Sequence, residues 1–222
     1  IDDYGEPDNV LSLVNTRSGF VSQESPLTEE EIWQESPADL IDYCINEPFE
    51  VTGWNERDGG GLAEVSPRGL AEAVTPRILE ELDEFQDEIP RLRNASSIYV
   101  TELLRGLRDK IDDDPESLPT DLLWTPLLDL CETIAVSPDE WSESVRINVA
   151  RLFRSAYSTS DLESVLDHND RIKEILFTQL EDPHPTEEQE HPPEGHAGYN
   201  NPAQTAINAV RPLALAALIT YS

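Results

Sequence analysis

The residues best suited to metal chemistry lie in one acidic stretch of the sequence, residues 181–201. Three histidines stand there among six carboxylates: His184, His191 and His196. Imidazole and carboxylate groups are common ligands for zinc and similar ions. Their spacings of seven and five residues match no common metal site. The sequence therefore favours a solvated loop, and a metal-dependent enzyme that uses this loop is the alternative.

Arginines on two predicted helices are the second group of candidates. Residues 91–111 carry five basic side chains against two acidic ones, and residues 145–160 carry three arginines and no acid. On a helical wheel, two arginines of each segment lie opposite the apolar stripe. The candidate binding residues are Arg105, Arg108, Arg146, Arg151 and Arg154. Arginine forks bind phosphate or carboxylate groups, which suggests an anion, a nucleic acid or an acidic partner. The alternative is pairing with nearby acids, where each exposed pair contributes about 0–1 kcal/mol.

Motifs of established catalytic chemistry are absent from the sequence. It contains no phosphate-binding glycine loop, zinc-protease helix, paired-cysteine site or hydrolase serine motif. Cys44 and Cys131 each stand alone in an apolar helical pattern, which is typical of small buried side chains in a reducing cytosol. The sequence therefore predicts no catalytic residue and no cofactor.

The charge of the chain is strongly negative, with 15 basic residues against 46 acidic ones and a formal net charge of −31. Such an excess destabilises a compact chain at low salt, but at about 1 M salt the screening length is only about 3 Å. The chain has only two lysines, and its acids are spread along its whole length. This composition resembles that of cytosolic proteins of extreme halophiles. An acidic protein that binds cations or basic partners is the alternative, and general nucleic-acid binding is disfavoured.

Helices are the elements expected to position these residues. Thr28 with Glu31, and Ser137 with Glu140, each fit a capping box. Ser-Pro or Thr-Pro pairs at 36–37, 66–67, 75–76 and 137–138 are further helix starts. Apolar stripes predict main helices at 70–89, 95–111, 120–136, 138–157, 161–180 and 202–221, with shorter ones at 29–35 and 37–46. No convincing alternating strand is found.

The predicted fold class is all-α, built from antiparallel helix pairs. The pair starts at 70, 120 and 161 are 50 and 41 residues apart, near the period of about 40–47 residues in HEAT and armadillo arrays. The helix pattern over residues 66–222 resembles helical-repeat regions of large multidomain cytosolic proteins and predicts a short HEAT-like stack. An irregular orthogonal helical bundle is the alternative. The resemblance implies a scaffold or partner-binding surface and assigns no site residue.

The expected organisation is an irregular lead-in over residues 1–27 and a helical domain over 28–222, with loops at 53–61 and 181–201. No run of about 18 apolar residues and no signal peptide are present, so a cytoplasmic chain without membrane contact is expected. The sequence has no Met, and the predicted helix 203–221 has no stop signal, which favours a segment of a longer polypeptide. Its expected partners are other domains of that polypeptide or another protein. The leading hypothesis is a non-catalytic helical scaffold, and a nucleic-acid- or nucleotide-associated module is the alternative.

Overall fold

A computed structural model describes residues 21–49, 55–56, 62–114, 124–159, 165, 167–187 and 208–221. These residues are mostly helical, which confirms the predicted helical class. The main helices are α1 (Glu29–Gln34), α2 (Pro37–Asn46), α3 (Pro67–Glu80), α5 (Ser97–Asp113), α6 (Trp124–Val136), α7 (Glu143–Ser158), α9 (Asn169–Gln179) and α12 (Val210–Tyr221). The short ones are α4 (Leu82–Phe85), η2 (Ile89–Asn94) and η4 (Pro138–Glu140).

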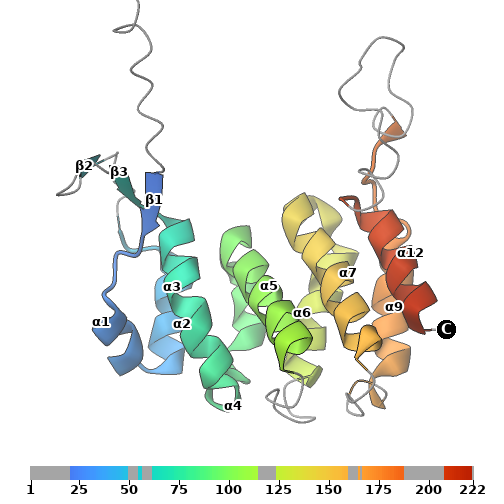
Figure 1. Cartoon of the computed structure of the whole chain (residues 1–222), viewed down its shortest axis with the longest axis horizontal. Coiled ribbons are helices and arrows are strands. Elements are labelled where there is room, and N and C mark those ends of the chain that lie inside the picture. The colour runs from blue at the N-terminus through green and yellow to red at the C-terminus, as the bar shows by residue number, and fades with distance from the viewer. Residues whose placement is uncertain are drawn as a thin grey trace, which may run out of the picture.

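The helices lie in two rows. Figure 1 shows α3, α5, α7 and α12 side by side, and each contacts the next. Behind them, η2 contacts α6, and α6 contacts α9. The rows also contact each other, because α7 packs against α6 and α9, and α12 packs against α9.

Serine and threonine caps begin several of the helices where the sequence predicts. Thr28 and Glu31 form the expected capping box at the start of α1. Ser36 caps α2, and Ser66 caps α3 by accepting a hydrogen bond from the backbone N–H of Gly69 at 3.1 Å. These side chains satisfy N–H groups that have no partner within the helix.

Two predicted helix starts are wrong. Thr75 and Pro76 lie inside α3, which continues from Pro67 to Glu80. Ser137 makes no capping hydrogen bond, and the residues after it form only the short helix η4. The long helix α7 begins later, where Ser142 accepts a hydrogen bond from the N–H of Val145 at 3.4 Å.

A small three-stranded sheet corrects the expectation that no strand is present. Strand β1 (Val21–Glu24) pairs in parallel with β3 (Leu62–Val65), and β2 (Asn55–Glu56) pairs antiparallel with β3. The first strand therefore lies inside the predicted lead-in 1–27, and β2 lies inside the predicted loop 53–61. Strand β1 reads Val-Ser-Gln-Glu and β3 reads Leu-Ala-Glu-Val, and neither alternates polar and apolar side chains, which is the sequence pattern of a half-buried strand.

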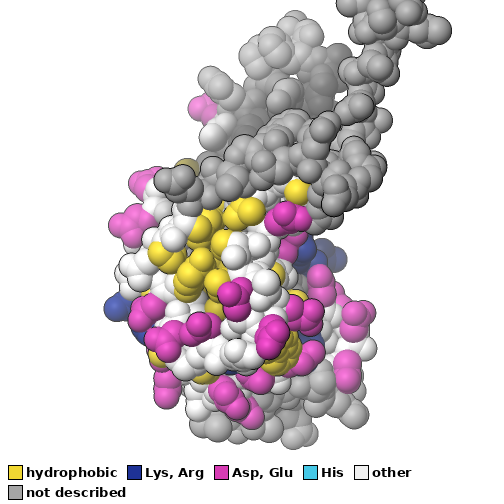
Figure 2. All heavy atoms as spheres, turned by 90° about the vertical axis from the view of Figure 1, so that its left-hand side faces the viewer, with side chains coloured by type: hydrophobic (Ala, Val, Ile, Leu, Met, Phe, Trp, Pro, Cys, Tyr) yellow, Lys and Arg dark blue, Asp and Glu magenta, His cyan; other side chains and the backbone are white. Residues whose placement is uncertain are grey.

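A continuous apolar core runs through both rows and includes both cysteines. Cys44 and Cys131 are free thiols and almost fully buried, as predicted for small core residues. Among the described residues, no helix is long and apolar enough to span a bilayer. Figure 2 shows the end of the molecule at the left of Figure 1, where acidic side chains are spread around a hydrophobic patch.

Candidate functional site

A cleft of about 350 Å³ lies between α5, α7 and the start of α12. Three of its lining residues are arginines that the sequence analysis selects. The lining residues are Arg108, Asp112, Arg151, Arg154, Ser155, Ser158, Asn208 and Leu213. The structure thus brings together three of the five candidate arginines.

Helical spacing explains why these side chains share one cleft. On α7, Arg151 is followed by Arg154, Ser155 and Ser158 at steps of three, four and seven residues, which lie on one face of a helix. On α5, Arg108 and Asp112 are four residues apart and also lie on one face. Because α5 and α7 pack against each other, the two faces meet at the cleft.

Arg151 is half-buried in this cleft. Its Nη2 donates a hydrogen bond to Oδ1 of Asn208 at 3.2 Å. Burial lowers the pKa of the Arg151 guanidinium from its ordinary value, and the positive charge of Arg108 lowers it further. Two like charges are therefore held close enough to repel each other.

Arg108 and Arg154 differ in whether a carboxylate pairs with their positive charge. Arg108 donates to Oδ1 of Asp109, the exposed neighbour on its own helix, from Nε at 3.1 Å and from Nη2 at 2.5 Å. Arg154 is exposed and forms no ion pair with any residue that the structure describes. Of the described residues that line the cleft, one has a carboxylate, Asp112, and it lies beside the three guanidinium groups.

Arg105 does not line the cleft. Its Nη2 lies 2.9 Å from Oε2 of Glu102, a buried carboxylate one turn earlier on α5. This contact corresponds to the intramolecular pairing that the sequence analysis gives as the alternative to anion binding.

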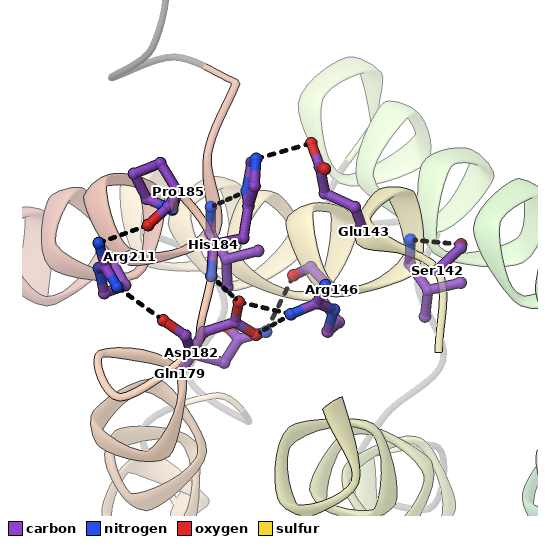
Figure 3. Close-up of polar contacts among 10 residues, drawn as sticks. Ser142, Glu143, Arg146, Gln179, Asp182, His184, Pro185 and Arg211 are labelled. Atoms are coloured by element: carbon purple, nitrogen blue, oxygen red, sulfur yellow. Dashed lines mark hydrogen bonds and ion pairs between the residues drawn. The ribbon is translucent and has the colours of Figure 1, made fainter. Parts of the chain in front are cut away.

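Arg146 is buried inside the fold. Figure 3 shows its guanidinium directed at Asp182, with which it forms an ion pair. The amide nitrogen of Gln179 donates to the carbonyl oxygen of Arg146 at 2.9 Å. Since Asp182 is also buried, the pair fixes the residues after α9 to α7 and leaves this guanidinium no access to an external anion.

His184 belongs to the same buried group of polar residues. Its backbone N–H donates to Oδ1 of Asp182 at 2.8 Å, and its Nε2 lies 3.1 Å from Oε1 of Glu143. Its Nδ1 accepts a hydrogen bond from the N–H of Val210 at 3.4 Å, at the start of α12. The side chain thus connects α7 to α12 rather than lying in a solvated loop.

The remaining part of the metal hypothesis cannot be placed, because His191 and His196 lie outside the described residues. Within the described residues, no three His, Cys, Asp or Glu side chains are grouped to hold a metal ion. Of the three candidate ligands, the structure describes only His184, and its side chain contacts Glu143 and the backbone of Val210.

Two further features of the surface have no clear signal in the sequence. Asn208 and the serines of α7 complete the arginine cleft, but they have no distinctive spacing relative to α5. Exposed apolar side chains also lie on α9 and α12, at the end of the rows, where Phe177, Leu215 and Ile219 are 57%, 50% and 64% exposed. The signal available in the sequence is that α12 contains no acidic residue.

Comparison with protein-family models, with curated proteins and with solved structures gives no match to this chain. Two surfaces of the described residues are candidates for function: the arginine cleft, and the apolar α9–α12 end face, which comprises Phe177, Leu215, Ile219 and Tyr221.

Proposed function

We propose that this chain is a non-catalytic helical scaffold, a protein-interaction segment of a larger salt-adapted protein. The observation that carries the proposal is the arrangement of α3, α5, α7 and α12 side by side, backed by a second row of helices (Figure 1). We interpret the two rows as a short HEAT-like array. In such arrays each unit contacts mainly its neighbours, so an end helix has one side without a neighbour in the row.

The apolar α9–α12 end face is the docking surface in this proposal. Leu215 and Ile219 are one turn apart on α12, and both are exposed. The Nζ of Lys173 lies 4.0 Å from the ring centroid of Tyr221, so this face of α9 meets the end of α12. Phe177 follows Lys173 by one turn and lies on the same face. Exposed apolar side chains therefore lie on both helices at this end of the rows: Phe177 on α9, and Leu215 with Ile219 on α12.

The composition of α12 identifies the occupant of this face. The chain has 46 acidic residues among 222, yet α12 has none. A solvent-facing helix of so acidic a protein would carry acids, whereas exposed apolar patches mark interaction sites. We infer that the apolar face of another helix, from another domain or another protein, packs against α12.

Replacing Leu215 and Ile219 together by Glu tests the docking surface. We expect the unsubstituted 222-residue chain in concentrated KCl to bind a hydrophobic dye and to self-associate as its concentration rises. The L215E/I219E variant should lose both properties and keep its helical circular dichroism. Val136, 68% exposed on α6, provides the matched control, because V136E adds an acid outside the patch. A parent chain that stays monomeric and binds no more dye than L215E/I219E would contradict the proposal.

The metal-dependent enzyme remains a separate candidate with its own test. It requires His191 and His196 to join His184, whose side chain already contacts Glu143 and the start of α12. Retention of one equivalent of a divalent ion after dialysis would support it. Loss of the ion would exclude the metal-dependent enzyme and would leave the scaffold proposal unchanged.

A further inference from the structure

We propose that the cleft formed by Arg108, Arg151 and Arg154 binds the phosphate group of a small phosphorylated molecule. This binding site is independent of the scaffold proposal, because the cleft lies between α5, α7 and the start of α12 and shares no described residue with the apolar end face. The ligand class follows from the number, arrangement and surroundings of the three guanidinium groups.

The number of arginines favours phosphate over carboxylate. Each guanidinium is a planar fork of N–H donors that can bind an oxyanion through two parallel hydrogen bonds. A terminal phosphate presents three oxygens, whereas a carboxylate presents two. Donors from α5 and α7 approach the cleft from two helices, which suits a tetrahedral group better than a planar one.

The surroundings of the cleft concentrate positive charge where the rest of the chain is acidic. Asp112 is the one carboxylate among the lining residues that the structure describes. Repulsion between Arg108 and Arg151, together with burial, lowers the pKa of Arg151. A dianion bound between the two guanidinium groups would relieve this repulsion, and the free energy of binding would gain from that relief.

A second cleft on the same molecule shows the contrast. It has a volume of about 370 Å³ and lies at the junction of α3 and α4. Its lining holds the carboxylates of Glu80, Glu81, Asp83 and Glu84, with Lys110 as its cation. Lys110 already donates a hydrogen bond to the carbonyl oxygen of Leu79 at 2.5 Å. Two clefts of similar size therefore differ in the sign of their charge, and the arginine cleft alone of these two suits an anion.

The size of the site favours a small molecule over a nucleic acid. A volume of about 350 Å³ is at the lower end of the range of about 300–1,000 Å³ that is typical of small-molecule sites. Nucleic-acid affinity rests on a series of phosphate contacts along a basic track. Arg105 and Arg146 do not extend such a track, because they are paired with Glu102 and Asp182.

Titration calorimetry with pyrophosphate tests the site directly. The full chain is used, at the lowest KCl concentration at which its circular dichroism is that of the folded state. We expect saturable binding of one pyrophosphate per chain. Arg154→Ser should weaken it by about tenfold or more, since it removes a guanidinium that would donate charge-assisted hydrogen bonds to the phosphate. Arg154 is exposed and unpaired among the described residues, so this variant is expected to fold.

Matched variants separate this site from general charge effects. Arg68→Ser removes an equal charge from an exposed i,i+4 pair with Glu72 on α3 and should change the affinity by less than about twofold. Arg154→Lys keeps the charge but not the fork, so its affinity should lie between those of the parent and R154S. Asp112→Asn should strengthen binding severalfold, because it removes the carboxylate that lines the cleft.

Two results would overturn the proposal. The first is a parent chain that binds pyrophosphate no more tightly than R154S does. The second is a chain that binds duplex DNA or polyglutamate in preference to pyrophosphate, which would assign the cleft to a polyanion. The L215E/I219E variant should bind pyrophosphate normally, so failure of the docking surface and failure of this site are distinguishable.

Discussion

Asp182 connects three segments of the chain. Its carboxylate accepts hydrogen bonds from Arg146 on α7 and from the backbone N–H of His184. Its carbonyl oxygen accepts one from Nη1 of Arg211 on α12 at 2.9 Å. Because Arg146 is buried as well, loss of the carboxylate charge would leave a buried cation without its counter-ion. Removal of one partner from a buried pair costs far more than removal of one from an exposed pair.

We therefore predict that Asp182→Asn lowers the free energy of unfolding by about 3 kcal/mol, measured by urea titration in concentrated KCl. Glu181→Gln is the matched control, since it removes one negative charge from the adjacent exposed residue. That control should change stability by no more than about 0.5 kcal/mol. Equal urea midpoints for the two variants would show that the Arg146–Asp182 pair does not stabilise the fold.

The two buried thiols make stability depend on alkaline pH. Burial, with a further contribution from Glu47, raises the pKa of Cys44 to about 12, and burial also raises the pKa of Cys131. An unfolded thiol titrates near 8.5. Since the folded pKa values lie above the unfolded ones, the unfolded chain loses these protons first. The stabilisation is complete below about pH 8.5 and is lost progressively as the pH rises toward the folded values.

Urea unfolding at neutral pH and at pH 10 measures this loss. Each thiol should lower the free energy of unfolding by about 1.4 kcal/mol for each pH unit above its unfolded pKa. Replacing both Cys44 and Cys131 by Ala should reduce the pH dependence, although buried tyrosines leave part of it. An unchanged dependence in the double variant would show that the thiols ionise as easily in the fold as in the unfolded chain.

At the level of elements, the contact between β1 and α3 depends on a residue without a side chain. Gly69 lies in the first turn of α3, and a Cβ there would lie 2.0 Å from the carbonyl oxygen of Glu24 in β1. Backbone atoms cannot move aside as the end of a flexible side chain can. A Cβ on Gly106 in α5 would instead lie 2.7 Å from Cδ1 of Leu79 and 2.9 Å from Cγ2 of Thr75, both at side-chain ends.

Gly69→Ala is accordingly predicted to destabilise the chain by about 2 kcal/mol or more, because the sheet must separate from α3. Gly106→Ala serves as the comparison, since both changes replace a helical glycine by the best helix former. Its gain of about 1 kcal/mol in helix propensity offsets part of the strain, so its net effect should be smaller. Thermal unfolding of both variants ranks them. A smaller loss for G69A than for G106A would contradict the close packing of β1 on α3.

The elements also show which parts of the fold the sequence can predict. The caps at Thr28, Ser36 and Ser66 depend on neighbours within three residues, so local chemistry is sufficient to identify them. Ser137 carries the same local signal, but the cap of the long helix is Ser142, and the buried side chain of Trp141 lies between the two. The sheet escapes prediction because β1 pairs with a strand about 40 residues away.

The same distinction applies to the candidate site. The helical wheel correctly places Arg151 and Arg154 away from the core, because helix geometry alone determines that face. Arg146 is different: its partner Asp182 is 36 residues away, and no local pattern indicates that this arginine is buried. Likewise, Arg108 lies near Arg151 only because α5 packs against α7. The sequence predicts the two helices but does not establish that they are neighbours.

At the scale of the whole molecule, the excess of acid is too large for internal pairing to neutralise. Many of the described arginines, such as Arg77, Arg91 and Arg171, already form ion pairs with carboxylates. Even if every base paired with one acid, the formal charge of −31 would leave 31 acids unpaired, which is more than two for every base. The repulsion among the remaining acids is a property of the whole surface, and added salt screens it without changing any one contact.

We predict that the urea midpoint of the chain rises steeply between about 0.1 M and about 2 M KCl, because the screening length falls from about 10 Å to below about 3 Å. Three exposed acids whose carboxylates pair with no described residue, Asp87, Glu140 and Glu174, provide the matched test. Their replacement by amides should raise the midpoint more at the lower salt concentration than at the higher one, since only unscreened charges repel. A chain equally stable at both concentrations would remove the salt-adapted interpretation, and the acids would then have to be explained by basic partners or bound cations.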